Sequence, residues 1–268
     1  MALKWFITIL SVLVLAYLAV ILFFFFMQES MLFFPVPPNP NVEKAHARFA
    51  FEVEREGVVL RGWLIRPQEV NGEHPLRVYY GGNAEDISAH LPELVSGQES
   101  WLLVPYRGYN GSEGKPGQAA LFTDAIAILE DVMRRYEMDW ENVVLIGRSL
   151  GSGVAVHVAS QKPVRSLVLI TPYDSIASVG QGHYSWLPVR LLARHPFNSL
   201  AVAPEIKQPA LFLVGGRDAI IPNQHSKRLR DAWGGKTIWE LIPEADHNNI
   251  ALWPGYQDAL ETFLAQPL

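Results

Sequence analysis

The sequence contains no cysteine among its 268 residues. Disulfide bonds, cysteine-ligated zinc and a cysteine nucleophile are therefore all excluded. The absence of cysteine is compatible with an oxidising compartment but does not establish one. Runs of lysine and arginine are also missing, and the formal net charge is −5. These two features argue against nucleic acid as a partner.

Three further patterns are absent. The loop at residues 106–117 has four glycines but no phosphate-cradling pattern followed by Lys-Ser or Lys-Thr, which argues against nucleotide binding there. No His-Glu-x-x-His pattern or comparable ligand spacing occurs, so we expect neither a metal nor another cofactor. Internal repeats and low-complexity tracts are missing too. Beyond an N-terminal segment, the remaining length suits one large α/β domain with a substantial core.

Charged side chains are missing from residues 5–28, and residues 5–27 are almost wholly apolar. At about 1.5 Å per residue, a helix of this length spans the ~30 Å hydrocarbon core of a bilayer. A cleaved signal peptide is the alternative, but its apolar region usually has about 7–15 residues and ends in small side chains. This run is longer and ends in four phenylalanines and Met27. We therefore expect residues 1–28 to form an uncleaved transmembrane signal anchor.

The flanking charges indicate an orientation for this anchor. Lys4 and the α-amino group precede it, and Glu29 follows it at once, which favours an N-terminus inside and the rest of the chain on the outer face. Residues 29–47 contain four prolines and predict a stiff, extended linker, whose apolar residues 31–34 could rest on the bilayer or pack on the domain. Since the sheet is expected to begin only near Phe49, we expect the chain without residues 1–28 to be soluble and active.

The most informative stretch lies in the middle of the chain. Residues 143–146 are apolar and predict a strand buried on both faces. They are followed by Gly147-Arg148-Ser149-Leu150-Gly151, the Gly-x-Ser-x-Gly form of a nucleophile elbow. In such a turn the serine hydroxyl projects from the sheet, and the glycines leave room for neighbouring backbone. The following helix directs its N–H groups at developing negative charge.

Strand-like and helix-like patterns alternate along residues 48–268. An antiparallel hairpin is expected over residues 48–66, and further strands at 76–80, 101–105, 143–146, 165–170, 210–214 and 236–242. This alternation predicts a mostly parallel sheet with helices on both faces. The stretch from about 172 to 207 shows one short helical patch near 189–194 and no strand-like alternation. We interpret it as a small lid over the site.

Three polar residues, Ser149, Asp218 and His247, each follow a different predicted strand. Because the carboxyl ends of parallel strands share one edge of a sheet, we expect these side chains to meet there. Their order along the chain is the one found in α/β-hydrolase folds. His247 would then take the proton of Ser149, and Asp218 would orient the imidazole and stabilise its charged form. Asp174, which follows the strand at 165–170, is an alternative acid.

The predicted strand at 76–80 ends in Gly81-Gly82-Asn83, a turn in which backbone N–H groups can face a ligand. We expect the N–H groups of Asn83 and Leu150 to form an oxyanion hole. An ordinary strand-to-helix turn, capped by Asn83 or Asp86, is the alternative for this segment. A further alternative for the whole chain is an α/β-hydrolase fold without catalysis.

Taken together, these features resemble the Bem46-like (YfhR-like) membrane-anchored α/β hydrolases, which are close to the serine aminopeptidase-type domain. The shared features run from the anchor to the last histidine and include Tyr106-Arg107-Gly108-Tyr109, Ser112-Glu113-Gly114, the elbow at 147–151, Asp218, Pro222, His225-Ser226 and His247-Asn248. The resemblance implies that Ser149, Asp218 and His247 form the catalytic triad. The family usually has His-Gly-Asn-Ala where this chain has Gly81-Gly82-Asn83-Ala84, so we expect different support for the oxyanion turn.

These observations predict a membrane-anchored serine hydrolase that forms an acyl-enzyme on Ser149. The expected substrate is an ester or a lipid-like acyl compound, because the domain is tethered at a bilayer. A serine peptidase or aminopeptidase of the same fold is one alternative. A non-catalytic, membrane-tethered binding module is another, from a different functional class. Fold alone does not choose among substrates.

Overall fold

An eight-stranded sheet organises the part of the chain that this computed structural model describes, residues 1–66 and 75–265. The strands are β1 (Ala50–Arg55), β2 (Val58–Ile65), β3 (Leu76–Tyr80), β4 (Ser100–Leu103), β5 (Val143–Arg148), β6 (Ser166–Ile170), β7 (Ala210–Gly215) and β8 (Thr237–Ile242). Their order is β1-β2-β4-β3-β5-β6-β7-β8. The β1–β2 and β2–β4 pairs are antiparallel and all later pairs are parallel. The predicted mostly parallel sheet with an edge hairpin is confirmed.

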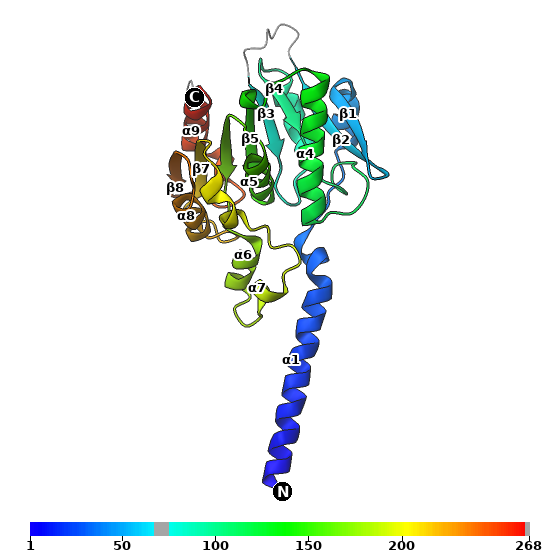
Figure 1. Cartoon of the computed structure of the whole chain (residues 1–268), viewed down its shortest axis with the longest axis vertical. Coiled ribbons are helices and arrows are strands. Elements are labelled where there is room, and N and C mark those ends of the chain that lie inside the picture. Colours follow the sequence, from blue (N-terminus) through cyan, green and yellow to red (C-terminus); the bar gives the residue numbers. More distant parts are fainter. Residues whose placement is uncertain (67–74, 266–268) are drawn as a thin grey trace.

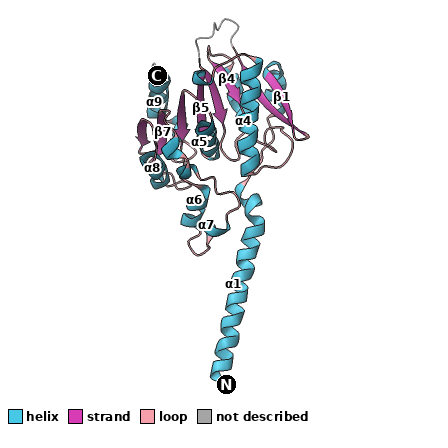
Figure 2. Ribbon diagram, viewed as in Figure 1, coloured by secondary structure: helices cyan, strands magenta, loops and turns pink. Residues whose placement is uncertain are grey.

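Helices cover both faces of this sheet (Figure 2). One face packs on α4 (Gln118–Arg135), α5 (Leu150–Gln161) and α8 (Asn223–Asp231), and the other on α3 (Leu91–Leu94) and α9 (Pro254–Leu264). Short 3-10 helices complete the described elements: η1 (Ala47–Phe49), η2 (Ile87–His90), η3 (Trp140–Asn142), η4 (Ser199–Ala201), η5 (Ala203–Glu205) and η6 (Ile250–Leu252). Two apolar cores result because alternate residues of a strand face opposite sides. Leu145 of β5 lies in one core, and its neighbours Val144 and Ile146 lie in the other.

A single long helix, α1 (Ala2–Leu32), projects away from the sheet (Figure 1). Its most apolar 18-residue window has a mean hydropathy of 3.0 and is entirely unburied. Among the described residues it is the one helix long and apolar enough to cross a membrane. It extends five residues beyond the apolar run at 5–27, because residues 28–32 favour a helix and the first proline, Pro35, comes only after them.

Residues 29–47, predicted to form a stiff, extended linker, are extended only in part. The chain is extended only between α1 and α2 (Pro40–Ala45). Asn39 caps α2 by accepting a hydrogen bond from the N–H of Asn41 at 3.0 Å, and Pro40 occupies the first helical position, where its missing N–H costs nothing. The apolar stretch 31–34 packs partly on the domain, with Phe33 only 5% exposed.

The segment predicted as a lid contains α6 (Ile176–His183) and α7 (Val189–Leu192), with no strand among these described residues. Helix α7 falls in the predicted patch, whereas α6 was not predicted. Two glycines, Gly180 and Gly182, lower the helix propensity of α6. Tertiary packing and a cap at Ser175, whose Oγ accepts from the N–H of Ser178 at 3.0 Å, compensate. Figure 1 shows α6 and α7 below the sheet, beside the part of α1 that is nearest the domain.

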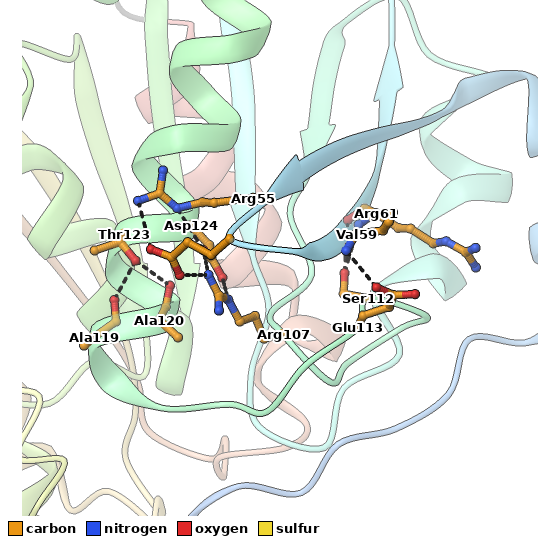
Figure 3. Close-up of polar contacts among 11 residues, drawn as sticks. Arg55, Val59, Arg61, Arg107, Ser112, Glu113, Ala119, Ala120, Thr123 and Asp124 are labelled. Atoms are coloured by element: carbon orange, nitrogen blue, oxygen red, sulfur yellow. Dashed lines mark hydrogen bonds and ion pairs between the residues drawn. The ribbon is translucent and has the colours of Figure 1, made fainter.

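Polar contacts fasten the loop between β4 and α4 to the edge hairpin (Figure 3). Asp124 of α4 accepts hydrogen bonds from Arg107 of the loop and lies 3.4 Å from Nε of Arg55. Ser112 Oγ accepts from the N–H of Arg61 at 3.0 Å. The loop is therefore held rigidly against the sheet edge, and this fixes the side chains that it presents to the turn after β3.

Candidate active site

Ser149 occupies the sharp turn between β5 and α5. Its φ and ψ are 49° and −116°, a region that non-glycine residues rarely adopt. Close packing maintains this backbone, since a Cβ at Gly147 would lie 2.5 Å from the carbonyl oxygen of Gly151. A Cβ at Gly151 would lie 2.0 Å from the carbonyl oxygen of Tyr80. The predicted elbow geometry is thus present, with both glycines sterically required.

A continuous line of hydrogen bonds starts at Ser149. Its Oγ lies 2.9 Å from Nε2 of His247, and Nδ1 of His247 lies 2.7 Å from Oδ2 of Asp218. The other carboxylate oxygen of Asp218 accepts from the N–H groups of Ile220 and Ile221 at 2.9 and 2.7 Å. Beside this carboxylate Nδ1 carries the proton, which leaves Nε2 free to accept one from Ser149. The arrangement can activate a serine hydroxyl for attack on a carbonyl carbon.

The alternative acid, Asp174, faces a different histidine. Its Oδ1 lies 2.7 Å from Nδ1 of His225, and its Oδ2 accepts from Nε of Arg228 at 2.7 Å. Burial raises the pKa of Asp174, but these bonds from His225 and Arg228 outweigh it, so that the pKa is lowered overall. The structure therefore brings Asp218, and not Asp174, to His247.

The turn after β3 lies against the serine. A Cβ on Gly82 would lie 3.7 Å from Cβ of Ser149, and Asn83 and Leu150 line the same cavity as Ser149. The side chain of Asn83 does not cap the following helix. Its Oδ1 accepts from Tyr109 Oη at 2.7 Å and from the N–H of Phe34 at 3.0 Å. The cap of η2 is instead Asp86, as the alternative interpretation of this turn allowed.

Sequence reasoning missed Glu85, the residue that holds this turn. One oxygen of Glu85 accepts from the N–H of Gly82, and the other accepts from Tyr79 Oη at 2.7 Å and lies 2.9 Å from Nε2 of His90. Arg148, inside the elbow, approaches Glu85 at 3.4 Å. Burial by itself raises the pKa of Glu85, but its contacts with His90, Arg148 and the turn prevail and lower the pKa to about 2.

Tyrosines of the loop between β4 and α4 complete the support. Tyr106 Oη donates to the carbonyl oxygen of Gly81 at 2.7 Å, and Tyr109 bonds Asn83 as described. Both tyrosines belong to the Tyr106-Arg107-Gly108-Tyr109 motif that the chain shares with the family, but no role was predicted for them. Gly81 stands where the family resemblance leads us to expect histidine, and a Cβ there would lie 2.4 Å from Cγ2 of Ile87. In this chain Glu85, Tyr106 and Tyr109 supply the contacts that fix the turn.

Replacement of Glu85 by glutamine should destabilise the domain by roughly 2–3 kcal/mol at pH 7, because the amide cannot carry the charge that the surrounding donors stabilise. The folded-state pKa of Glu85 is depressed, so its contribution is present above the unfolded pKa of about 4.5 and is lost as the pH falls toward about 2. Unfolding of the detergent-solubilised chain at pH 7 and pH 3 should therefore show a smaller pH difference for Glu85→Gln than for the unmodified chain.

The exposed Glu93 on α3 provides the matched control. Glu93→Gln should keep both the stability and its pH dependence within about 0.5 kcal/mol. Equal stability of Glu85→Gln and the unmodified chain at pH 7 would contradict the role given to Glu85.

A cavity of about 490 Å³ adjoins Ser149 and His247. Its size lies in the range of roughly 300–1,000 Å³ that is usual for small-molecule sites. Its lining is mostly apolar, and the polar side chains in it, besides Ser149 and His247, are Gln28, Asn83, His183, His195 and Asn248. One wall comes from α6 and α7, and the facing wall comes from the C-terminal part of α1. The cavity can therefore hold an apolar group while presenting a carbonyl to Ser149.

Comparison with known proteins extends this description, although no family model matches the chain. The chain is 33% identical over 267 residues to Rv2307c of Mycobacterium tuberculosis, covering 96% of this chain and 94% of that protein. It is 30% identical over 231 residues to the alpha/beta hydrolase domain-containing protein WAV2 of Arabidopsis thaliana, covering 75% and 74%. It is 26% identical over 242 residues to bem46 of Schizosaccharomyces pombe, covering 87% and 80%.

Among solved structures, an esterase of Pyrococcus furiosus superimposes with a TM-score of 0.65. The match covers 87% of this chain and 97% of the esterase at 21% sequence identity. At this level of identity the likeness establishes the fold, which is that of the α/β hydrolases.

Proposed function

The chain belongs to the family of α/β hydrolases that includes Bem46 and YfhR, and we propose that it is an esterase-type serine hydrolase. The observation that carries this proposal is the hydrogen-bonded line from Ser149 through His247 to Asp218 at the strained elbow. Esterases among the structural neighbours support the same reaction class. We assign Ser149 as nucleophile, His247 as base and Asp218 as the orienting acid.

The proposed reaction proceeds in two halves. Nε2 of His247 takes the proton as Ser149 Oγ attacks the carbonyl carbon, and the resulting oxyanion is held by the N–H groups of Asn83 and Leu150. Asp218 stabilises the imidazolium, which then protonates the leaving alcohol as the carbon–oxygen bond breaks. Water attacks the acyl-enzyme with His247 again as base, and a carboxylic acid leaves with Ser149 restored.

We further propose that α1 crosses a bilayer as an uncleaved anchor, with the N-terminus inside and the hydrolase domain on the outer face. Lys4 before the apolar run and Glu29 after it support this orientation. Residues 29–47 form the junction, and residues 48–268 form the domain, with its lid at about 172–207. Retention in the membrane after carbonate extraction tests the anchor. A mature N-terminus near residue 30 would instead indicate cleavage.

Two assays test the proposed reaction. A fluorophosphonate probe should label the chain at Ser149, because only an activated serine reacts, and this separates an enzyme from a binding module. Turnover of p-nitrophenyl esters should exceed that of aminoacyl-amides at matched concentration. Faster turnover of the amides would favour the peptidase alternative. The absence of both labelling and turnover would contradict the proposal.

A further inference from the structure

One face of α1 belongs to the substrate cavity. Phe24, Phe25, Gln28 and Leu32 recur at helical spacing, are partly buried and line the cavity together with Ser149. The adjacent Phe26 is 72% exposed and does not line the cavity. An anchor that served only to hold the domain at a membrane would not need a face matched to the active site.

The lid is fastened along this face. Tyr17 Oη donates to the carbonyl oxygen of Trp186 at 2.8 Å, and the ring of Phe24 meets that of Trp186 edge-on at 5.8 Å. Nearer the domain, Gln28 Oε1 accepts from the N–H of Arg194 at 2.7 Å. The contacts extend over twelve residues of α1, or about 18 Å at about 1.5 Å per residue.

The depth of the lowest contact follows from the length of α1. A spanning helix needs about 20 residues within the hydrocarbon core. Even if that segment begins at Ala2, the first residue of α1, it reaches roughly to residue 21. Tyr17 lies four residues earlier, about 6 Å inside the core. Any tilt, or any later start, places Tyr17 deeper. If α1 spans a bilayer as proposed, the end of the lid at Trp186 therefore lies within it.

The outer surface of the lid suits that location. Trp186 and Leu191 are 53% and 83% exposed. Exposed apolar side chains that gather on one segment are unfavourable in water. Tryptophan and tyrosine are favoured where a bilayer meets water. Trp186 and Leu191 therefore suit contact with a membrane, and the exposed Arg190 and Arg194 suit the boundary between membrane and water.

The turn that carries Asn83 is also tied to the end of α1. Asn83 Nδ2 donates to the carbonyl oxygen of Leu32 at 2.6 Å, and its Oδ1 accepts from the N–H of Phe34. The anchor thus contacts the site at both ends of the cavity. It contributes side chains to the apolar part and backbone contacts to the turn beside Ser149.

From these contacts we infer that the cavity between α1 and the lid binds the acyl chain of a membrane amphiphile, which enters from the bilayer without crossing water. The substrate class is a long-chain carboxylic ester. This inference rests on the proposed function and on α1 spanning a bilayer. It also revises the expectation that a chain without residues 1–28 stays active, since that deletion removes Phe24, Phe25 and Gln28 from the cavity wall and should lower the turnover of long-chain esters.

The first test measures acyl-chain preference with the full chain in phosphatidylcholine vesicles. With kcat/KM referred to ester dissolved in water, each methylene that ends in the apolar cavity contributes about 0.8 kcal/mol, or about fourfold, so burial of only three to four of the ten extra methylenes of p-nitrophenyl laurate already gives roughly a 100-fold advantage over the acetate. Phe25→Ala should lower this laurate-to-acetate ratio about tenfold. Phe26→Ala, the same substitution on the exposed side of α1, should leave the ratio unchanged.

The second test measures the depth of the lid, and the absence of native cysteine makes it direct. A nitroxide attached to Leu191→Cys should be more accessible to oxygen than to a water-soluble nickel reagent. The same label on Arg134→Cys should show the reverse. Arg134, whose side chain is 76% exposed, belongs to the last turn of α4, and this end of the helix points away from α1 (Figure 1).

The outcomes separate this inference from the proposed function. Fluorophosphonate labelling of Ser149 with a flat chain-length profile would overturn the inference and leave the hydrolase proposal in place. So would an unchanged ratio in Phe25→Ala, or a label at Leu191→Cys that is as accessible from water as the one at Arg134→Cys. A lack of labelling and of ester turnover would overturn both.

Discussion

Replacement of Ser149 by alanine should abolish ester turnover, by about 10⁴-fold or more, while the domain stays folded. The expectation follows from the geometry, because Ser149 Oγ is the hydroxyl that lies 2.9 Å from Nε2 of His247 and faces the cavity. Removal of this oxygen deletes the nucleophile and leaves His247 and Asp218 in place. The turnover that remains should therefore come only from the binding and positioning of the substrate in the site.

The measurement compares ester turnover and fluorophosphonate labelling in Ser149→Ala and in Ser160→Ala. Ser160 lies on the same helix, α5, and its Oγ donates to the carbonyl oxygen of His157, away from the cavity. Ser160→Ala should keep both turnover and labelling. Substantial turnover by Ser149→Ala, or labelling at another residue, would show that the elbow assignment is wrong.

The sheet was predictable because its signals are local. Apolar runs such as residues 143–146 and 210–214 fix buried strands to within two residues, and the chain order of strand ends predicts which side chains share an edge. The helices α2 and α6 were missed because proline and glycine lower the expectation of a helix. Their caps, at Asn39 and Ser175, became decisive only in the folded context.

The site was predictable in part for the same reason. Ser149, Asp218 and His247 follow strand ends, so their proximity could be inferred from their positions along the chain. Glu85 carries no comparable signal, because its partners Tyr79, Gly82 and His90 are defined by side-chain direction in a tight turn. The contribution of α1 to the cavity wall could not be predicted from the sequence, for a different reason.

The contacts of α1 join residues that are far apart in the sequence. Tyr17 and Trp186 are separated by 169 positions, and Gln28 and Arg194 by 166. An apolar run long enough to span a bilayer predicts an anchor, but it does not reveal which of its faces meets the domain. Periodicity could have suggested a face only if α1 had a polar side, and residues 5–27 have almost none.

Replacement of Asp218 by asparagine should lower turnover by about 10³–10⁴-fold. The carboxylate of Asp218 accepts the Nδ1 proton of His247 and stabilises the imidazolium formed during acyl transfer. An amide at this position favours the wrong tautomer, in which Nε2 carries the proton and cannot accept one from Ser149. The loss should appear mainly in kcat, since Asp218 does not line the cavity.

Asp174→Asn is the matched comparison, because Asp174 is also buried and also paired with a histidine. Its partners are His225 and Arg228, so the substitution leaves the line from Ser149 to Asp218 intact. It should destabilise the domain by roughly 1–3 kcal/mol and change turnover less than tenfold. Thermal unfolding and kcat, measured on both variants, separate the two effects. The opposite result, an inactive Asp174→Asn and an Asp218→Asn that is only less stable, would contradict this assignment. The catalytic acid would then be the aspartate that follows β6, and its partner His225 would take the place of His247 in the reaction.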